Sequence, residues 1–186
     1  LHYDGSLAEQ LTSTKLSSLS LSVLLSGFVQ SEGGTAGNIA DSLALLGERP
    51  VLVASIGREQ VGYLDRLARM GVEVSLVHIS PERTASFTVL TDAHACQIGG
   101  FYPGAMADAM SLSLQRFTGQ NAIVMLSAHD PRQMGVQLIE AAQGRLRFIF
   151  DIGQQVAALR PEVIRQGLAA SELLLVNEYE LDLLSK

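Results

Sequence analysis

The pattern that most constrains this chain is the alternation of short apolar runs with amphipathic helical segments. Runs typical of strands and of helices take turns after Pro103: helix 105–116, strand 122–126, helix 131–142, strand 146–151, helix 161–169, strand 173–176, and a helix from Glu178. Continuous apolar runs of this length are typical of strands buried on both faces of a parallel sheet. Right-handed strand–helix–strand crossovers then cover such a sheet with helices, so the sequence predicts an α/β fold.

The first part of the chain contains an alternating strand pattern, followed by a helical pattern, a continuous apolar strand and an amphipathic helix. Residues 19–25 alternate between serine and apolar side chains, which predicts a strand with one solvent-facing side. A helical pattern that ends at Gly47, a continuous apolar strand at 51–56 and an amphipathic helix at 60–70 follow. We expect these three segments to extend the parallel sheet.

Residues 72–102 differ from the rest because strands follow strands without a helix between them. The β-rich runs are 72–79, 84–90 and 97–102, separated by turn-forming residues. This segment is therefore predicted to stand off the main sheet as a flap.

Composition restricts the class of partner. The 186 residues are 47% hydrophobic, carry a formal net charge of −6 and contain no run of Lys or Arg, which argues against a nucleic-acid surface and favours a small molecule. The single cysteine, Cys96, cannot form an intramolecular disulfide, and the four histidines lack zinc-type spacing, so a reducing cytoplasm is expected. No window reaches the roughly 18 uninterrupted apolar residues of a membrane span, and the alternating stretch 16–29 does not match a signal sequence.

Glycines gather at the start of the first long helical pattern, in Gly33-Gly34-Thr35-Ala36-Gly37-Asn38. This segment matches neither the phosphate-binding loop of P-loop enzymes nor the dinucleotide-binding fingerprint. Two interpretations stay open at this point. The glycines could let the backbone approach a ligand, with Asn38 serving a hydroxyl, or they could form a tight turn in which Gly37 allows close helix packing.

Two further polar segments follow apolar strands, where ligands of open parallel sheets bind. Asn177 and Glu180 are spaced to face one ligand, such as the water shell of Mg²⁺, or to cap the helix that they open. Asp151 ends a strand and is either a ligand-facing carboxylate or a loop residue bonded to its own backbone. His94 and Cys96 are interpreted as chance neighbours in a turn rather than a metal pair, and the residues show no nucleophile–base–acid set.

Four motifs in a fixed order along nearly the whole chain carry a family resemblance. They are Gly33–Asn38 before a helix, Val53–Gly57 with Gly62 following, Phe101-Tyr102-Pro103-Gly104-Ala105-Met106, and Asn177-Glu178-Tyr179-Glu180. Together they resemble the ribokinase-like carbohydrate kinases, often called the PfkB family, which includes ribokinase and adenosine kinase. The segments around Gly33 and Phe101 look closest to bacterial adenosine-kinase-like members.

The resemblance implies an α/β, three-layer ribokinase-like sandwich with a mostly parallel central sheet and a small β lid. Residues 1–186 would form one such domain, incomplete at the C-terminal side, with the lid strands within 1–32 and 72–102. It also implies ATP and Mg²⁺ as cosubstrates, and transfer of the γ-phosphoryl group to a hydroxyl of a nucleoside or sugar, with a nucleoside preferred. Exposed lid strands could pair edge to edge with those of a second copy and so form a homodimer.

By position, the resemblance assigns Gly33, Gly34 and Asn38 to the hydroxyls of the acceptor. Phe101 or Tyr102 would stack on a base or cover the sugar. It assigns Asn177 and Glu180 to the family's Asn-x-x-Glu motif, which orders magnesium and phosphate, with Glu180 reaching the metal through water.

The departures from the family pattern concern both ends of the chain. Family members carry a Gly-Ala-Gly-Asp motif whose Asp is the general base, and this motif is expected beyond Lys186, so no catalytic residue is assigned here and the chain alone is expected to be inactive. The family's opening strand, with an acidic residue for the acceptor, is expected before Leu1. Two other classes stay open: a non-catalytic nucleoside- or sugar-binding or regulatory protein, and a dimerising structural domain.

Overall fold

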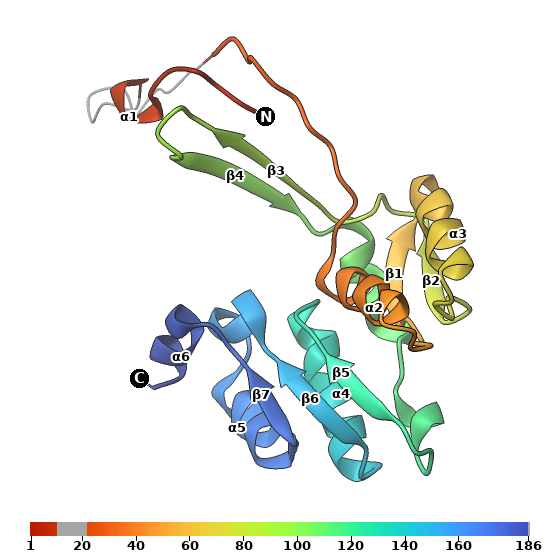
Figure 1. The fold of residues 1–186 in the computed structure, drawn as a ribbon. Coiled ribbons are helices and arrows are strands. Elements are labelled where there is room, and N and C mark those ends of the chain that lie inside the picture. Colours follow the sequence, from red (N-terminus) through yellow and green to blue (C-terminus); the bar gives the residue numbers. More distant parts are fainter. Residues whose placement is uncertain (11–21, 186) are drawn as a thin grey trace. The chain divides into compact units, whose positions relative to one another are not determined.

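The computed structural model describes residues 1–10 and 22–185, which belong to two compact units (Figure 1). The first unit is built from the residues up to 32 together with 85–103. The second is built from 33–84 and from residue 104 onward. Two separate stretches of sequence therefore make up each unit.

The first unit is organised around an antiparallel hairpin. Strand β3 (Ser86–Thr91) pairs with β4 (Gln97–Tyr102) over their whole length. The N-terminal segment joins them through His2, which forms bridges to Gly27 and Thr91. The short helix α1 (Leu7–Gln10) is held by the buried Asp92, whose carboxylate accepts a hydrogen bond of 2.7 Å from the Leu7 N–H.

In the second unit, residues 33–84 form a small parallel sheet with helices. The elements in chain order are α2 (Thr35–Leu45), β1 (Ala54–Gly57), the 3-10 turn η2 (Arg58–Gln60), α3 (Val61–Arg69) and β2 (Val77–Ser80). Strands β1 and β2 are parallel, as a helical crossover requires. A core of apolar side chains from α2, α3 and β1 holds them together, with Leu67 fully buried at its centre.

The rest of the second unit contains a three-stranded parallel sheet in the order β5-β6-β7. The elements in chain order are η3 (Gly104–Ser111), η4 (Gln115–Phe117), β5 (Ile123–Leu126), α4 (Pro131–Gln143), β6 (Arg147–Asp151), η5 (Gly153–Ala157), α5 (Pro161–Ala170), β7 (Leu173–Leu175) and α6 (Glu178–Leu184). The central strand β6 buries Phe148 and Phe150 completely against α4 and α5. Burial of each such ring stabilises the fold by about 1.5–3 kcal/mol relative to exposure.

The predicted α/β class is confirmed, and most of the predicted helices and strands lie within a few residues of their observed bounds. Two differences concern the sheets. The parallel strands form a two-stranded and a three-stranded sheet, where the prediction has one central sheet, because β1 and β5 are each hydrogen-bonded to one neighbour only. The strands at 51–56 and 72–79 are also shorter than expected, since outside β1 and β2 a single bridge, Val51 to Glu73, pairs them.

Three predictions from the hydrophobic pattern were wrong. The run at 72–79 was expected in the flap, but β2 pairs in parallel with β1 and belongs to the second unit. Of the strand expected at 19–25, residues 19–21 lie outside the described residues, and 22–25 have no regular structure. The α-helix expected at 105–116 is instead two 3-10 segments, η3 and η4. The helix is interrupted at Asp108, whose φ of −93° and ψ of 20° are not helical and whose carboxylate lies 3.0 Å from His78 Nε2.

Candidate functional site

The first candidate segment lies at the N-terminus of α2. Gly34 is the N-cap, with φ of 98° and ψ of 128°, a conformation that only glycine adopts without strain, and it has no side chain to cap the helix. No atom lies within 4 Å of the place where a Cβ would stand on Gly33 or on Gly34. The start of α2 is therefore open and free of side-chain caps, and a helix start of this kind can receive ligand oxygens.

The remaining residues of this glycine segment have two different environments. Gly37 is buried, and a Cβ there would overlap the Tyr63 hydroxyl, so the close-packing interpretation is confirmed for Gly37. Asn38 lies one residue further along α2 and is exposed. The segment thus combines a packing glycine with exposed positions, and the acceptor-binding roles of Gly33, Gly34 and Asn38 stay predictions.

The second candidate segment opens α6. Asn177 is its N-cap, and its side-chain oxygen accepts a hydrogen bond of 2.9 Å from the Glu180 N–H. Glu180 accepts in return from the backbone N–H of Asn177 at 3.0 Å and from its side-chain amide at 2.9 Å. The capping interpretation is therefore confirmed, and both carboxylate oxygens of Glu180 are already engaged. A carboxylate with both oxygens already hydrogen-bonded is better suited to bind a metal ion through a coordinated water than directly. The water can donate a hydrogen bond to a lone pair that remains on the carboxylate.

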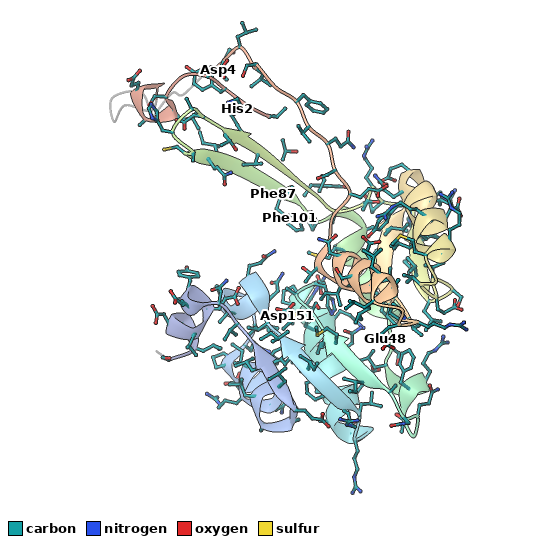
Figure 2. The ribbon with its side chains drawn as sticks, in the orientation of Figure 1. His2, Asp4, Glu48, Phe87, Phe101 and Asp151 are labelled. Carbon is teal, nitrogen blue, oxygen red and sulfur yellow. The ribbon has the colours of Figure 1, made fainter. Side chains whose placement is uncertain are left out.

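Asp151 lies in the same unit and is electrostatically linked to this segment. It is the last residue of β6 and is half-buried (Figure 2). Burial raises the pKa of the Asp151 carboxyl, and the negative charge of Glu180 raises the pKa further, while the Ser127 hydroxyl acts in the opposite direction. A cation near Asp151 would offset the cost of ionising this carboxyl. The donor set of this edge therefore fits Mg²⁺.

The carboxyl ends of three parallel strands supply these groups. Ser127 follows β5 directly and is buried, Asp151 ends β6, and Asn177 follows β7 by two residues. Parallel strands end at the same edge of a sheet, where open α/β proteins bind their ligands. The sequence analysis identified Asp151 and Asn177 but missed Ser127, because a lone serine after a strand carries no pattern.

Phe101 belongs to the first unit, in β4, and its side chain is 51% exposed. The hairpin register places it directly opposite Phe87 of β3, which is 63% exposed, and Figure 2 shows both rings on the hairpin. A Cβ at Gly99 would come within 2.5 Å of Phe87 Cζ, so glycine at this position makes room for that ring. The result is an exposed aromatic pair on one face of the hairpin.

Phe87 was missed in the sequence analysis. The two β-rich runs were identified, but pairing Phe87 with Phe101 requires the register, which the turn between Thr91 and Gln97 sets. That turn is held by Asp92, whose carboxylate accepts from the N–H groups of His94 and Cys96 at 2.8 and 2.9 Å.

Asp130, which directly precedes α4, has a structural role. Asp130 caps α4 by accepting from the N–H groups of Arg132 and Gln133. Within residues 1–10 and 22–185, no group of three or more His, Cys, Asp or Glu side chains could hold a metal ion directly. In the same part of the chain, no helix is both long and apolar enough to cross a membrane.

Similar proteins agree with this architecture. A nucleoside kinase of Methanothermobacter thermautotrophicus is 28% identical over 155 residues, which are 81% of this chain and 50% of that protein. The solved structure of Burkholderia thailandensis nucleoside kinase in complex with inosine matches with a TM-score of 0.82 and 26% identity, covering 98% of this chain and 58% of that one. The same kinase in complex with ADP-inosine matches with a TM-score of 0.76 at 26% identity, covering 99% of this chain and 58% of that chain.

The chain thus spans between half and three fifths of the length of these relatives. The family model described as pfkB family carbohydrate kinase matches residues 8–186. This match includes both candidate segments, Gly33–Asn38 and Asn177–Glu180, together with the hairpin. The chain therefore belongs to the pfkB family of carbohydrate kinases.

Proposed function

We propose that the complete protein is an ATP- and Mg²⁺-dependent kinase that transfers the γ-phosphoryl group to a hydroxyl of a nucleoside. Family membership supports the reaction class, and relatives named nucleoside kinases support the acceptor class. The observation that favours a nucleoside over a free sugar as the acceptor is the exposed pair Phe87 and Phe101. Aromatic rings of this kind stack on a nucleobase, and a free sugar has no base. Among nucleosides, adenosine and other purine nucleosides offer the largest face for stacking.

The acceptor hydroxyls bind, in this proposal, at the start of α2. Open space beside Gly33 and Gly34 lets a sugar ring approach the backbone closely, and a Cβ at either position would occupy part of it. Asn38 offers an amide that both donates and accepts hydrogen bonds, which suits a hydroxyl. These contacts orient the hydroxyl that receives the phosphoryl group, and orientation supplies a large share of the rate in phosphoryl transfer.

The nucleotide side of the reaction is assigned to the edge that carries Asn177, Glu180 and Asp151. When bound there, Mg²⁺ neutralises the phosphate charge of ATP. Glu180 orders the metal's water shell while it keeps the capping box, since each of its oxygens retains a lone pair. Asp151, a carboxylate that burial and Glu180 make costly to ionise, adds to the negative potential that attracts the cation.

The general base and the donors that stabilise the transferring phosphoryl group are not assigned to this chain. We propose that the remainder of the complete protein supplies both, in the Gly-Ala-Gly-Asp motif that the family uses. The 186 residues by themselves are then expected to bind acceptor without turning it over. ATP and a single free thiol, the exposed Cys96, both suit the cytoplasm.

The experiment is a phosphorylation assay of the complete protein with ATP, Mg²⁺ and a panel of nucleosides and free sugars. Transfer to nucleosides, lost on chelation of Mg²⁺, supports the proposal, whereas turnover of free sugars alone contradicts the nucleoside assignment. The second candidate is a non-catalytic binding protein of the same fold. Thermal stabilisation by a nucleoside without any consumption of ATP would favour that candidate.

A further inference from the structure

Helix α2 begins with the proposed acceptor segment, yet few of its side chains anchor it. Within Thr35–Leu45, the buried residues are Gly37 and Ala40. The two large residues at its C-terminal end, Leu45 and Leu46, are 74% and 80% exposed. Small residues bury little apolar area of their own, so the position of this helix depends on the neighbour against which they pack.

That neighbour is Tyr63 of α3, which lies in the same unit and in the same apolar core as Ala40. The Tyr63 side chain is buried, and its hydroxyl lies where a Cβ on Gly37 would stand. The ring carbon Cζ is the next atom, at 3.3 Å from that place. The Tyr63 hydroxyl therefore sets how closely the first turn of α2 approaches α3.

A second pair of residues joins the two helices one turn further along each of them. Arg66 Nη1 on α3 donates to Asp41 Oδ1 on α2 at 3.2 Å. The Arg66 guanidinium also lies over the Tyr63 ring, with its Cζ atom 5.2 Å from the ring centroid. Because a cation is attracted to an aromatic face, Arg66 helps to hold the Tyr63 ring in place while it pairs with Asp41.

The contact at Gly37 reaches the proposed acceptor residues through the backbone of α2. The N–H of Asn38, the next residue, donates to the carbonyl oxygen of Gly34 at 2.9 Å. This hydrogen bond closes the first turn of the helix, so a displacement of Gly37 also moves Gly34 and Asn38. Misplacement of a reacting group by about 1 Å can lower a rate about 100-fold.

We propose that Tyr63 is a positioning residue, whose hydroxyl contact with Gly37 sets where the first turn of α2 presents Gly34 and Asn38 to the acceptor. Its effect on the acceptor rests on the proposed function. Tyr63 acts through Gly37 and not on the acceptor itself. The contact also accounts for a glycine inside this helix, where alanine would otherwise be more favourable.

Adding a methyl group on one side of the contact and removing the hydroxyl from the other tests this role. In the complete protein, Gly37→Ala places a Cβ against the Tyr63 hydroxyl and should lower kcat/KM about ten- to 100-fold for the nucleoside that is turned over best. The KM for Mg²⁺–ATP should stay within about twofold of wild type. Tyr63→Phe keeps the ring and should change kcat/KM by less than about threefold.

The double variant Gly37→Ala/Tyr63→Phe is the decisive one. Without the hydroxyl, the atom nearest to the new methyl group is Cζ of the ring at 3.3 Å, which a shift of a few tenths of an ångström accommodates. The double variant should therefore recover most of the kcat/KM that Gly37→Ala loses. A double variant no better than Gly37→Ala would overturn the proposal.

Thermal unfolding tests the same contact without reference to any activity. Gly37→Ala should lower Tm by about 2–6 °C because of overpacking, and Tyr63→Phe in that background should restore it. Gly135→Ala is the matched control, since Gly135 is also a buried glycine of a helix, α4. A Cβ there would meet the methyl groups of Val163 at 3.7 and 3.8 Å, which is ordinary contact. Gly135→Ala should not lower Tm, and nucleoside kcat/KM should stay within about twofold of wild type.

Two further results would overturn the positioning role. One is a wild-type kcat/KM in Gly37→Ala despite a lowered Tm, because the contact would then affect stability alone. The other is an equal rise in the KM values for nucleoside and for Mg²⁺–ATP, because the effect would then not be confined to the acceptor. If the wild-type protein transfers no phosphoryl group, the proposed function fails, and the Tm values still decide whether Tyr63 sets the packing of α2.

Discussion

The N-termini of α2 and α6 are both candidate binding sites, yet they are built in opposite ways. The start of α2 has a glycine as its cap, no side-chain hydrogen bond and open space beside Gly33 and Gly34. The start of α6 is closed by the reciprocal hydrogen bonds of Asn177 and Glu180. A bare helix start can accept a ligand directly, whereas a capped one can act only through groups that its side chains hold. This difference is why we propose that the acceptor binds at α2 and a hydrated metal at α6.

The largest effect is expected at the bare helix start. Gly34→Ala forces a Cβ onto a residue with φ of 98°, which costs about 1–3 kcal/mol, and it also places a methyl group in the open space where we propose that the acceptor binds. We expect kcat/KM for the nucleoside to fall about 100-fold by steady-state kinetics.

Gly47→Ala is the control for backbone strain, because Gly47 lies at the other end of α2 with φ of 89° and open space around it. It should lower thermal stability about as much as Gly34→Ala while leaving the nucleoside KM unchanged. Equal losses of kcat/KM in both variants would mean that strain, and not acceptor binding, explains the effect.

The aromatic pair tests whether acceptor recognition also involves a base. Phe101→Ala removes half of the exposed pair, and base–aromatic stacking is worth about 1–3 kcal/mol, so the nucleoside KM should rise about 5- to 150-fold. Phe101→Tyr keeps an aromatic ring and should stay near wild type. A nucleoside KM that does not respond to Phe101→Ala would limit recognition to the sugar side at α2.

Substitution at the capped start of α6 should first lower the stability of the folded protein. Asn177→Ala removes the N-cap of α6 and its bond to the Glu180 N–H, at a cost of about 1 kcal/mol. The loss should appear as a decrease of about 2–4 °C in Tm, measured by calorimetry on the complete protein. Asn177→Ser should retain the cap, since serine also accepts from the backbone N–H at this position of a capping box and places no second carboxylate beside Glu180. An unchanged Tm for Asn177→Ala would contradict the closed arrangement of this helix start.

The smallest effect concerns Asp151, an acidic group whose pKa the charge of Glu180 helps to raise. Its pKa in the folded protein lies above its unfolded value, mainly because of burial. Ionisation of Asp151 therefore opposes folding, and the folded state loses stability as the pH rises above the unfolded pKa of about 4. Asp151→Asn should raise Tm at pH 7 by about 1–3 °C, with a smaller gain near pH 4. A decrease in Tm at pH 7 would mean that the carboxylate has a stabilising partner.

The elements with strong periodicity could be predicted from the sequence alone. β6 was predicted from the short apolar run that contains Phe148 and Phe150, and α4 from the helical pattern at 131–142. The helix expected after Ala105 could not be predicted correctly, since Asp108 interrupts it in contact with His78, a partner from a distant strand. Tertiary contacts of this kind leave no local pattern.

The residues of the candidate site likewise differ in whether the sequence alone could identify them. Gly33, Gly34, Asn177 and Glu180 stand in motifs that the sequence displays. Phe87 depends on the hairpin register, so it has no signal in its neighbouring sequence.

The difference between the two helix starts is tested most directly by one kinetic comparison. The KM values for nucleoside and for Mg²⁺–ATP are measured for Gly33→Ala and Glu180→Gln in the complete protein. Gly33→Ala fills open space without a strained backbone, and Glu180→Gln removes the charge while a capping box stays available to glutamine. We predict that Gly33→Ala raises only the nucleoside KM and that Glu180→Gln raises only the Mg²⁺–ATP KM. Both variants raising the same KM, or neither KM changing, would contradict the assignment of acceptor to α2 and metal to α6.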